Sequence, residues 1–581
     1  MWGSSSTKQI PDAKIAERSR LLKAFSTSLT PGDSTRYLNA SVKDIVTHIE
    51  SGEWTAVHVV EAYIAQAIVA QEATNCITEV LFEQALKQAK ELDEEFTSTK
   101  KLRGPFHGVP FSVKDQFDIT GFDSTIGFTQ WANKPATTNA VLVQHLISLG
   151  AIPILKTNVP QTMFSFESSN PLWGRTTNPY NSEFTCGGSS GGEAAVLAMD
   201  GAVFGIGSDI GGSLRMPPAY CGIYSLKPSA GRISRKGAAS PDPAFEGIKD
   251  VVGPLGRSVE DLDLFCRSLF GRDDDFGDHG FVPLPYREVS LPEKLRFGYF
   301  VNDGFAKASP ANKRAILFTV ESLREAGHEC VEVEIPDATE AIQIFTALCS
   351  ADAYRRMTSH LGPDSMESYL SLPVYMSRVP GFLRSIASWI VSTFIGDTKF
   401  ASLAQATSPK SFGEYSAWVD KRNDYNDRFH DKVWKHYALD GIICPVQAVP
   451  QVPNGGATDL LPIAVGTALF NVVNSPCGVI PVTHVNGKKD QLTDEWTDPK
   501  KRNGCKLIEN QLYSGFMGKR AYYDAEKMDN MPVGIQLVGR RYEDEKVLGM
   551  MRVVDEAVKA GNKTKFGPGA FRYRSRTSVA N

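Results

Sequence analysis

Two glycine-flanked serine motifs dominate the centre of the sequence. The first, at residues 187–192, reads GGSSGG and contains Ser189 and Ser190; the second, at residues 209–213, reads DIGGS and ends at Ser213. Glycine allows a tightly curled backbone that a substrate can approach closely. Successive N–H groups in such a turn can converge on an anion, as the oxyanion of acyl transfer requires. The expected donors are the amides of Ile210, Gly211, Gly212 and Ser213.

A serine hydroxyl is a weak nucleophile until a base removes its proton. The ten histidines lie in unrelated contexts, and His107 is better explained as a packed side chain. The other candidate base is a lysine whose pKa is lowered by burial. Lys114 fits, because the apolar run in GVPFSVKD would carry it into the core. A neutral amine there could take a proton from Ser189, which could take one from Ser213.

Two non-catalytic interpretations of the glycine-rich centre need weighing. GGSSGG alone resembles a flexible linker, but a predicted helix at 193–199 and a second Gly-Gly-Ser follow it at once. A phosphate loop would need a lysine directly after the glycines, and none is present. From composition and spacing alone, nucleophilic catalysis and a structural loop both remain open.

The segments around this centre alternate between strand-like and helix-like patterns, which favours an α/β fold. Helical spacing is expected at 41–54 and along the run 55–96. Buried strands are expected within 107–115, 151–158, 294–300, 439–450, 470–485 and 531–539, and helices within 140–150, 313–327 and 543–560.

The chain is expected to fold as one large domain, because no repeat and no Pro/Gly/Ser-rich linker divides it. The predicted organisation is a helical or loose lead-in at 1–38, a domain at 39–565 and a C-terminal tail at 566–581. Within the domain we distinguish a catalytic centre, an apolar helical segment and a charged surface excursion, at 104–233, 373–397 and 485–530.

Composition excludes several classes of function. The net charge of −4 and the pI near 6.3 give no support for nucleic-acid binding. The nine cysteines form no CxxC pair, so reduced thiols are expected and neither a metal nor another cofactor is implied. The N-terminus has no apolar signal region and no run is long enough to span a bilayer. An intracellular protein is expected, cytoplasmic or peripherally associated with a membrane.

The segment 373–397 is unusually apolar. Between 382 and 395 only Arg384 is charged. One helical side carries Phe382, Ile386, Trp389, Ile390 and Phe394, and the other carries Arg384, Ser385, Ser388 and Ser392. Three explanations stay open: a helix packed on the core, a helix lying on a membrane surface through 382–395, or a contact in a homodimer.

With these motifs together and in this order, the sequence resembles the amidase signature family over roughly residues 42–560. The resemblance implies a twisted mixed β-sheet core surrounded by helices. It makes Ser213 the acylated nucleophile, Ser189 a proton relay on a cis peptide bond and Lys114 the general base. It also implies support of the site by Ser190, Asp209 and Arg215.

Within this family the sequence is most similar to fatty acid amide hydrolases. The segment 157–179 resembles their substrate channel, where Met163 and Phe164, beside Ser189, would contact the substrate. The segment 373–397 lies where those enzymes carry a membrane-docking cap. Fungal acetamidases share CGGSSGGE, so small amides or carbamates remain an alternative to N-acyl fatty amides. An ammonia-transferring amidotransferase subunit is the remoter alternative.

Overall fold

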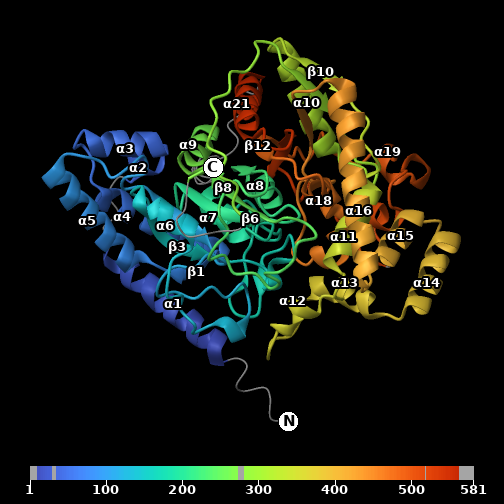
Figure 1. Cartoon of the computed structure of the whole chain (residues 1–581), viewed down its shortest axis with the longest axis horizontal. Coiled ribbons are helices and arrows are strands. Elements are labelled where there is room, and N and C mark those ends of the chain that lie inside the picture. The colour runs from blue at the N-terminus through green and yellow to red at the C-terminus, as the bar shows by residue number, and fades with distance from the viewer. Residues whose placement is uncertain (1–8, 29–33, 273–279, 517, 562–581) are drawn as a thin grey trace.

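The computed structural model describes residues 9–28, 34–272, 280–516 and 518–561. Within them, one mixed sheet of eleven strands runs through the molecule with helices around it (Figure 1). β2 is parallel to β3 and β6, and β9 is parallel to β10 and β11, whereas the remaining pairs are antiparallel. In sheet order the strands are β1 (Ile77–Val80), β3 (Ile152–Thr157), β2 (Pro110–Lys114), β6 (Phe204–Asp209), β8 (Val251–Gly256), β7 (Tyr224–Lys227), β12 (Cys477–His484), β13 (Pro532–Val538), β11 (Gly441–Pro445), β9 (Arg296–Tyr299) and β10 (Glu329–Glu332).

The helices cover the sheet and build a second, mostly helical part of the molecule. Those of the first half are α1 (Gln9–Ser28), α2 (Thr35–Leu38), α3 (Val42–Glu50), α4 (Ala56–Thr74), α5 (Phe82–Thr99), α6 (Val141–Ser148), α7 (Gly191–Ala198), α8 (Met216–Cys221) and α9 (Val259–Leu269). Those of the second half are α10 (Pro310–Glu325), α11 (Ala338–Cys349), α12 (Arg355–Ser359), α13 (Ser368–Arg378), α14 (Gly381–Ile390), α15 (Thr398–Ala406), α16 (Phe412–Phe429), α17 (Ala457–Leu460), α18 (Val465–Val472), α19 (Asp494–Thr497), α20 (Lys506–Tyr513) and α21 (Asp544–Gly561).

The predicted α/β alternation is confirmed in most segments, and two predictions need correction. The run 55–96 is two helices, α4 and α5, because Asn75 adopts a left-handed conformation after α4 and the short strand β1 follows. The run 470–485 is only partly a strand: Phe470 to Val472 end helix α18, and β12 begins at Cys477. A short apolar run fits a buried helix as well as a buried strand.

Parts of the predicted domain plan can be compared with the structure, although the boundaries themselves stay predictions. The lead-in contains α1, which is anchored by Arg18 to the carbonyl of Ile77 and by Lys14 to Glu79 and Asp123. The charged stretch 485–530 contains α19 and α20 and contributes buried side chains. Residues 566–581 lie outside the described residues.

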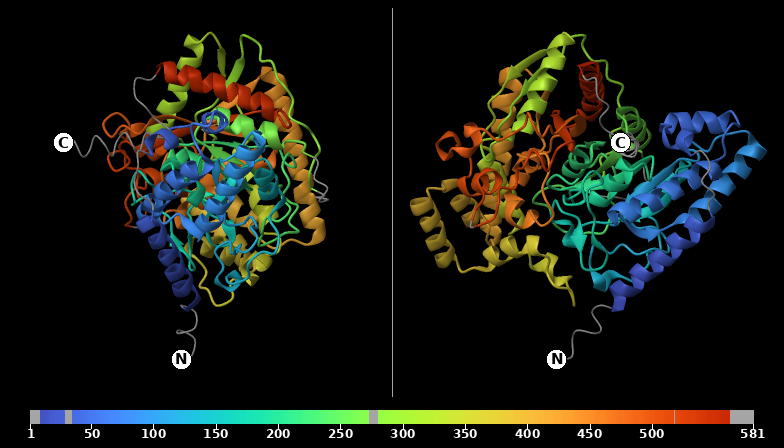
Figure 2. Two further views of the ribbon diagram at one scale, coloured as in Figure 1. Left: turned by 90° about the vertical axis from the view of Figure 1, so that its left-hand side faces the viewer. Right: turned by 180° about the vertical axis from the view of Figure 1, so that it is seen from behind.

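The apolar side chains of residues 382–395 are not packed on the core, whereas Val374, at the start of the segment 373–397, is buried in it. Helix α14 and the π-helical turn Val391–Ile395 lie at the edge of the molecule in two opposite views (Figures 1 and 2). Phe382, Trp389 and Phe394 are 67%, 58% and 74% exposed. Ser388 instead faces inward and donates a hydrogen bond to the carbonyl of Ala401. We call this exposed apolar face of residues 382–395 the cap face.

None of the helices in the described ranges combines the length and the apolarity needed to cross a bilayer.

Candidate active site

Lys114 is the last residue of β2 and is fully buried. Its Nζ lies 2.7 Å from Ser189 Oγ and 2.8 Å from Ser208 Oγ. Burial lowers its pKa to about 7, against the opposing effect of nearby carboxylates. The structure therefore has the predicted setting, a lysine that a strand carries into the core. Near neutral pH a large fraction of Lys114 is the neutral amine, which is the form that can act as a base.

Ser208 fixes how the lysine can bond. The Ser208 hydroxyl donates to Gln116 Oε1 over 2.5 Å, so its own proton is already used. Lys114 must then donate an N–H to Ser208. The structure has Lys114 Nζ donating to Ser189 Oγ as well; in the neutral amine a second N–H and the lone pair remain, and the lone pair is the group that could accept the Ser189 proton.

Ser189 and Ser190 lie at the start of helix α7. The Gly188–Ser189 peptide bond is cis, as the family resemblance implies. Gly188 has no room for a side chain, because an added Cβ would lie 2.5 Å from the carbonyl oxygen of Ser165. Ser190 Oγ donates a 3.4 Å hydrogen bond to the carbonyl of Ser208, which ties the GGSSGG turn to β6.

The DIGGS turn follows β6 and is held by a buried ion pair. Asp209 accepts from Nε and Nη2 of Arg215 over 3.0 and 2.9 Å, and both side chains are fully buried. Burial would raise the pKa of Asp209, but Arg215 and Lys227 hold it at about 2. Asp209 and Arg215 thus occupy the supporting positions predicted for them.

Of the four predicted oxyanion donors, one is already hydrogen bonded in this structure. The amide of Gly212 already donates to Asp209 Oδ1 over 2.9 Å, so it is occupied in holding the turn. The amides of Ile210, Gly211 and Ser213 make no hydrogen bond to any described residue. These three are the donors that remain available to an anion.

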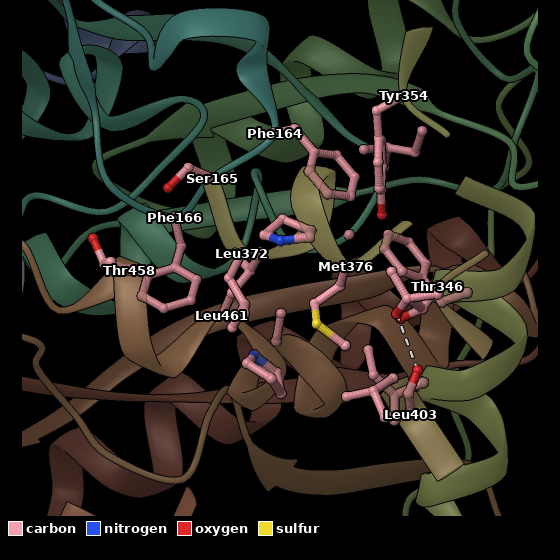
Figure 3. A pocket seen from close by; sticks show the side chains of 18 of the residues that line it. Phe164, Ser165, Phe166, Thr346, Tyr354, Leu372, Met376, Leu403, Thr458 and Leu461 are labelled. Carbon is pink, nitrogen blue, oxygen red and sulfur yellow. Dashed lines mark hydrogen bonds between the residues drawn. The ribbon is translucent and has the colours of Figure 1, made fainter. Parts of the chain in front are cut away.

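Ser213 opens into a large apolar cavity (Figure 3). The space inside, including its open mouth, measures about 1070 Å³. Met163 and Phe164 line it as predicted, and Met163 reaches it through a left-handed backbone conformation that is uncommon outside glycine. The remaining walls come from helices α11, α13 and α15, through residues that include Ile342, Phe345, Leu372, Met376 and Leu403.

A second, more polar cavity of about 730 Å³ opens at Ser189. It shares Met163, Phe164, Ile210 and Tyr354 with the apolar cavity, so the two spaces adjoin at the serines. Ser189 and Ser213 form no hydrogen bond with each other in this structure. Their separation does not exclude a relay, because catalytic hydrogen bonds often tighten only when substrate is bound.

Several residues that shape the site were not predicted. Ser208, on β6, accepts a hydrogen bond from Lys114. Gln116, two residues after β2, accepts one from Ser208. Thr467 Oγ1 donates to the carbonyl of Gly211, and Asn471 bonds both Asp209 and Arg215. The last two come from α18, so no local sequence signal links them to the motifs. His107, in contrast, is buried away from the site and accepts from the amide of Arg103, as expected for a packed side chain.

Comparisons with known proteins identify the family of the chain. The family model "Amidase" matches residues 58–548. The chain is 33% identical to a fatty acid amide hydrolase 1 of Caenorhabditis elegans, over 88% of this chain and 86% of that protein. It is 30% identical to an acetamidase of Emericella nidulans, over 89% and 88% of the two chains. A solved fatty acid amide hydrolase structure superposes with a TM-score of 0.79 at 26% identity, covering 96% of this chain and 91% of that one.

The family match covers most of the chain, and the relatives are aligned over most of their own lengths. The fold, a large mixed sheet surrounded by helices, is also that of the solved relative. The chain therefore belongs to the amidase signature family and is an amide hydrolase.

Proposed function

We propose that the chain hydrolyses N-acyl amides whose acyl group is a long hydrocarbon chain, with Ser213 as nucleophile, Ser189 as relay and Lys114 as base. The observation that carries the substrate class is the apolar cavity at Ser213. Ligand pockets are lined mainly by hydrophobic and aromatic side chains, and here Phe345, Leu372 and Leu403 give the space beside Ser213 a lining that suits a hydrocarbon chain. Its walls offer methyl groups and aromatic rings and few hydrogen-bonding groups (Figure 3).

The adjoining polar cavity suits the amine half of the substrate. It is lined by Ser189, Ser208 and Gln116 and by the carboxylates of Asp242 and Asp352. A carbonyl carbon placed between the two cavities would lie with its acyl chain on the Ser213 side and its nitrogen on the Ser189 side. The nitrogen would then be close to the serine that returns the proton.

The proposed reaction proceeds in two halves. Ser213 Oγ attacks the carbonyl carbon, its proton passes to Ser189, and the Ser189 proton passes to the Lys114 amine. The oxyanion is stabilised by the amides of Ile210, Gly211 and Ser213. As the C–N bond breaks, Lys114 returns the proton through Ser189 to the leaving nitrogen. Water then attacks the Ser213 ester by the same relay, and the carboxylic acid leaves.

Hydrolysis of a saturated acyl series should discriminate the substrate class. Each buried methylene contributes about 0.8 kcal/mol, which corresponds to about a fourfold gain in kcat/KM. From acetamide to long primary amides and N-acylethanolamines, kcat/KM should therefore climb by several orders of magnitude. Leu403→Trp, which fills part of the apolar cavity, should remove much of this gain while acetamide hydrolysis persists. Leu317→Ser on α10 is the control.

Preference for the shortest amides would contradict the fatty acyl proposal. The enzyme would then be an acetamidase-like hydrolase of small amides or carbamates, and the apolar cavity would need another explanation. Little activity on any amide, together with a stably bound partner subunit, would favour the amidotransferase alternative.

We further propose that the cap face rests on a lipid surface, so that a poorly soluble amide can enter from the membrane. Leu372 and Met376 of α13, the helix that leads into α14, line the apolar cavity, and Leu372 is also exposed to solvent. The aromatic side chains of Trp389 and Phe394 contact each other edge to face and remain exposed. Amphipathic helices of this kind bury such side chains at the boundary between headgroups and acyl chains.

Sedimentation with phosphatidylcholine vesicles should test the cap face. The double substitution Trp389→Ser and Phe394→Ser should weaken vesicle binding about 100-fold, because burial of each large apolar side chain contributes about 1.5 kcal/mol or more. Leu317→Ser, which removes an exposed apolar side chain away from the cap face, should bind as the wild type does. The expected homodimer is measured in parallel by light scattering. If the double variant turns a dimer into a monomer and vesicle binding is unchanged, a second copy covers the cap face.

A further inference from the structure

Glu193 is a buried carboxyl group next to the catalytic machinery that the proposed reaction does not use. It belongs to α7, directly follows the GGSSGG motif and is fully buried. Ser112 of β2 donates to its Oε2, and Thr157 of β3 donates to its Oε1, each over 2.6 Å. The carboxyl group occupies space left free by Gly205, where an added Cβ would lie 1.9 Å from Oε2.

The hydrogen bonds favour the ionised form of this group. Ser112 and Thr157 are fully buried, and Glu193 is the acceptor for both hydroxyl protons among the described residues. If Glu193 were protonated, its own proton would join the hydroxyl protons of Ser112 and Thr157. One of these three protons would then have no acceptor among the described residues. Bonds of 2.6 Å are also typical of a hydroxyl that donates to a carboxylate.

The same two strands place this carboxylate beside Lys114. Ser112 precedes Lys114 by two residues on β2, so their side chains point to the same face of the sheet. Thr157 is paired with Lys114 across β2 and β3. Burial lowers the pKa of Lys114 to about 7 and raises that of Glu193 to about 8, so the ionised form of Glu193 depends on its two hydroxyl donors and on the charge of a protonated Lys114.

The other charged groups around Lys114 already have cationic or hydroxyl partners. Three carboxylates act on its charge, from Glu193, Asp209 and Asp250. Asp209 is paired with Arg215 and Asp250 with Arg235, whereas Glu193 has no arginine partner among the described residues. Of the remaining neighbours, Lys156 is bonded to Asp123 and Ser124, Asp115 is bonded to Thr78 and Thr125, and the Cys76 thiol is buried.

We propose that Glu193 is a positioning residue that stabilises the Lys114 ammonium ion formed during acyl transfer. This inference rests on the proposed function, in which the proton of Ser213 reaches Lys114 through Ser189. The proton stays on Lys114 until it returns to the leaving nitrogen, and Glu193 remains a carboxylate throughout. It contributes a fixed negative charge in a fully buried site, where such a charge is most effective.

The pH dependence of kcat/KM for Glu193→Gln tests the proposal. The acid limb reports loss of the neutral lysine, so removal of the nearby negative charge should move it to lower pH, by about one unit. The plateau should fall about tenfold, because the ammonium ion formed in the reaction is less stable. Thr157→Val removes one hydroxyl donor and should move the limb in the same direction by less. This milder variant decides the question if Glu193→Gln does not fold.

The matched control is Glu509→Gln on α20, another buried carboxylate that accepts from a backbone amide and lines neither cavity. Its acid limb should coincide with that of the wild type. A Glu193→Gln enzyme with a lower rate or stability but an unmoved limb would reduce Glu193 to a structural residue and overturn the proposal. If Ser213→Ala retains activity, the proposed function itself fails, and that outcome is separate.

Discussion

Replacement of Ser213 by alanine is expected to lower kcat/KM for any amide substrate by about 10⁴-fold or more, since loss of the nucleophile from a hydrolase triad has effects of this size. The side chain lies at the floor of the apolar cavity and is followed by α8. Only the hydroxyl is removed, so the Asp209–Arg215 pair that shapes the turn should persist. The rate is measured with a long-chain primary amide under single-turnover and steady-state conditions.

Two further experiments would test whether Ser213 is the nucleophile. Ser322→Ala, which removes a buried serine hydroxyl from α10, should leave the rate unchanged. A fluorophosphonate probe should label the wild-type enzyme once, on the peptide that contains Ser213, and should not label Ser213→Ala. Recovery of the adduct on Ser189 would reverse the roles of the two serines.

Replacement of Lys114 by methionine should lower kcat/KM about 10⁴-fold at neutral pH, at the upper end of what a general base contributes. Methionine has a similar length but neither accepts a proton nor carries a charge. In the wild type, kcat/KM should decrease as the pH is lowered through about 7. Burial lowers the pKa of Lys114 to about 7, and the protonated amine cannot act as a base. The variant should lack this limb, and its remaining activity should rise with hydroxide concentration.

Lys156→Met provides the control for loss of a buried lysine, since Lys156 lies on β3 and donates to the carbonyl of Asp123 and the hydroxyl of Ser124, not to Ser189 or Ser208. It should retain the acid limb near pH 7 whatever it does to stability. If Lys114→Met kept both the rate and the limb, the base would have to be sought elsewhere in the chain.

The sequence predicted the parts of the site that lie in local motifs. Lys114 is recognisable because an apolar strand delivers a single lysine into the core, and the two serines because glycines surround them. Ser208 was missed because its importance depends on strand register: β6 pairs with β2, which brings its hydroxyl to Lys114. Thr467 and Asn471 were missed because α18 reaches the DIGGS turn only in the folded chain.

Elements of the fold, too, were predicted where the signal lies in a local stretch of sequence. Strands with several consecutive apolar residues, such as β11 and β13, were predicted from pattern alone. The last three residues of α18, Phe470 to Val472, were taken for part of a strand, because periodicity does not separate helix from strand over a short apolar run. The cap face had the apolar stripe of a core helix, and only the structure placed Trp389 and Phe394 in solvent, because a stripe does not specify what covers it.

The walls of the apolar cavity have one more consequence. The groups proposed to carry the reaction lie between residues 114 and 213, whereas Ile342, Phe345, Leu372, Met376 and Leu403 come from a later stretch of the chain. Apart from the contribution of Met163 and Phe164, most of the wall that would choose the substrate is thus encoded by a different part of the gene from the groups proposed for bond cleavage. Mutations can then reshape the substrate range without passing through an inactive enzyme, and overall identity to a relative is a poor guide to its substrate. Exchange of residues 338–406 between this chain and an acetamidase should move the acyl-length preference and leave the acid limb in place.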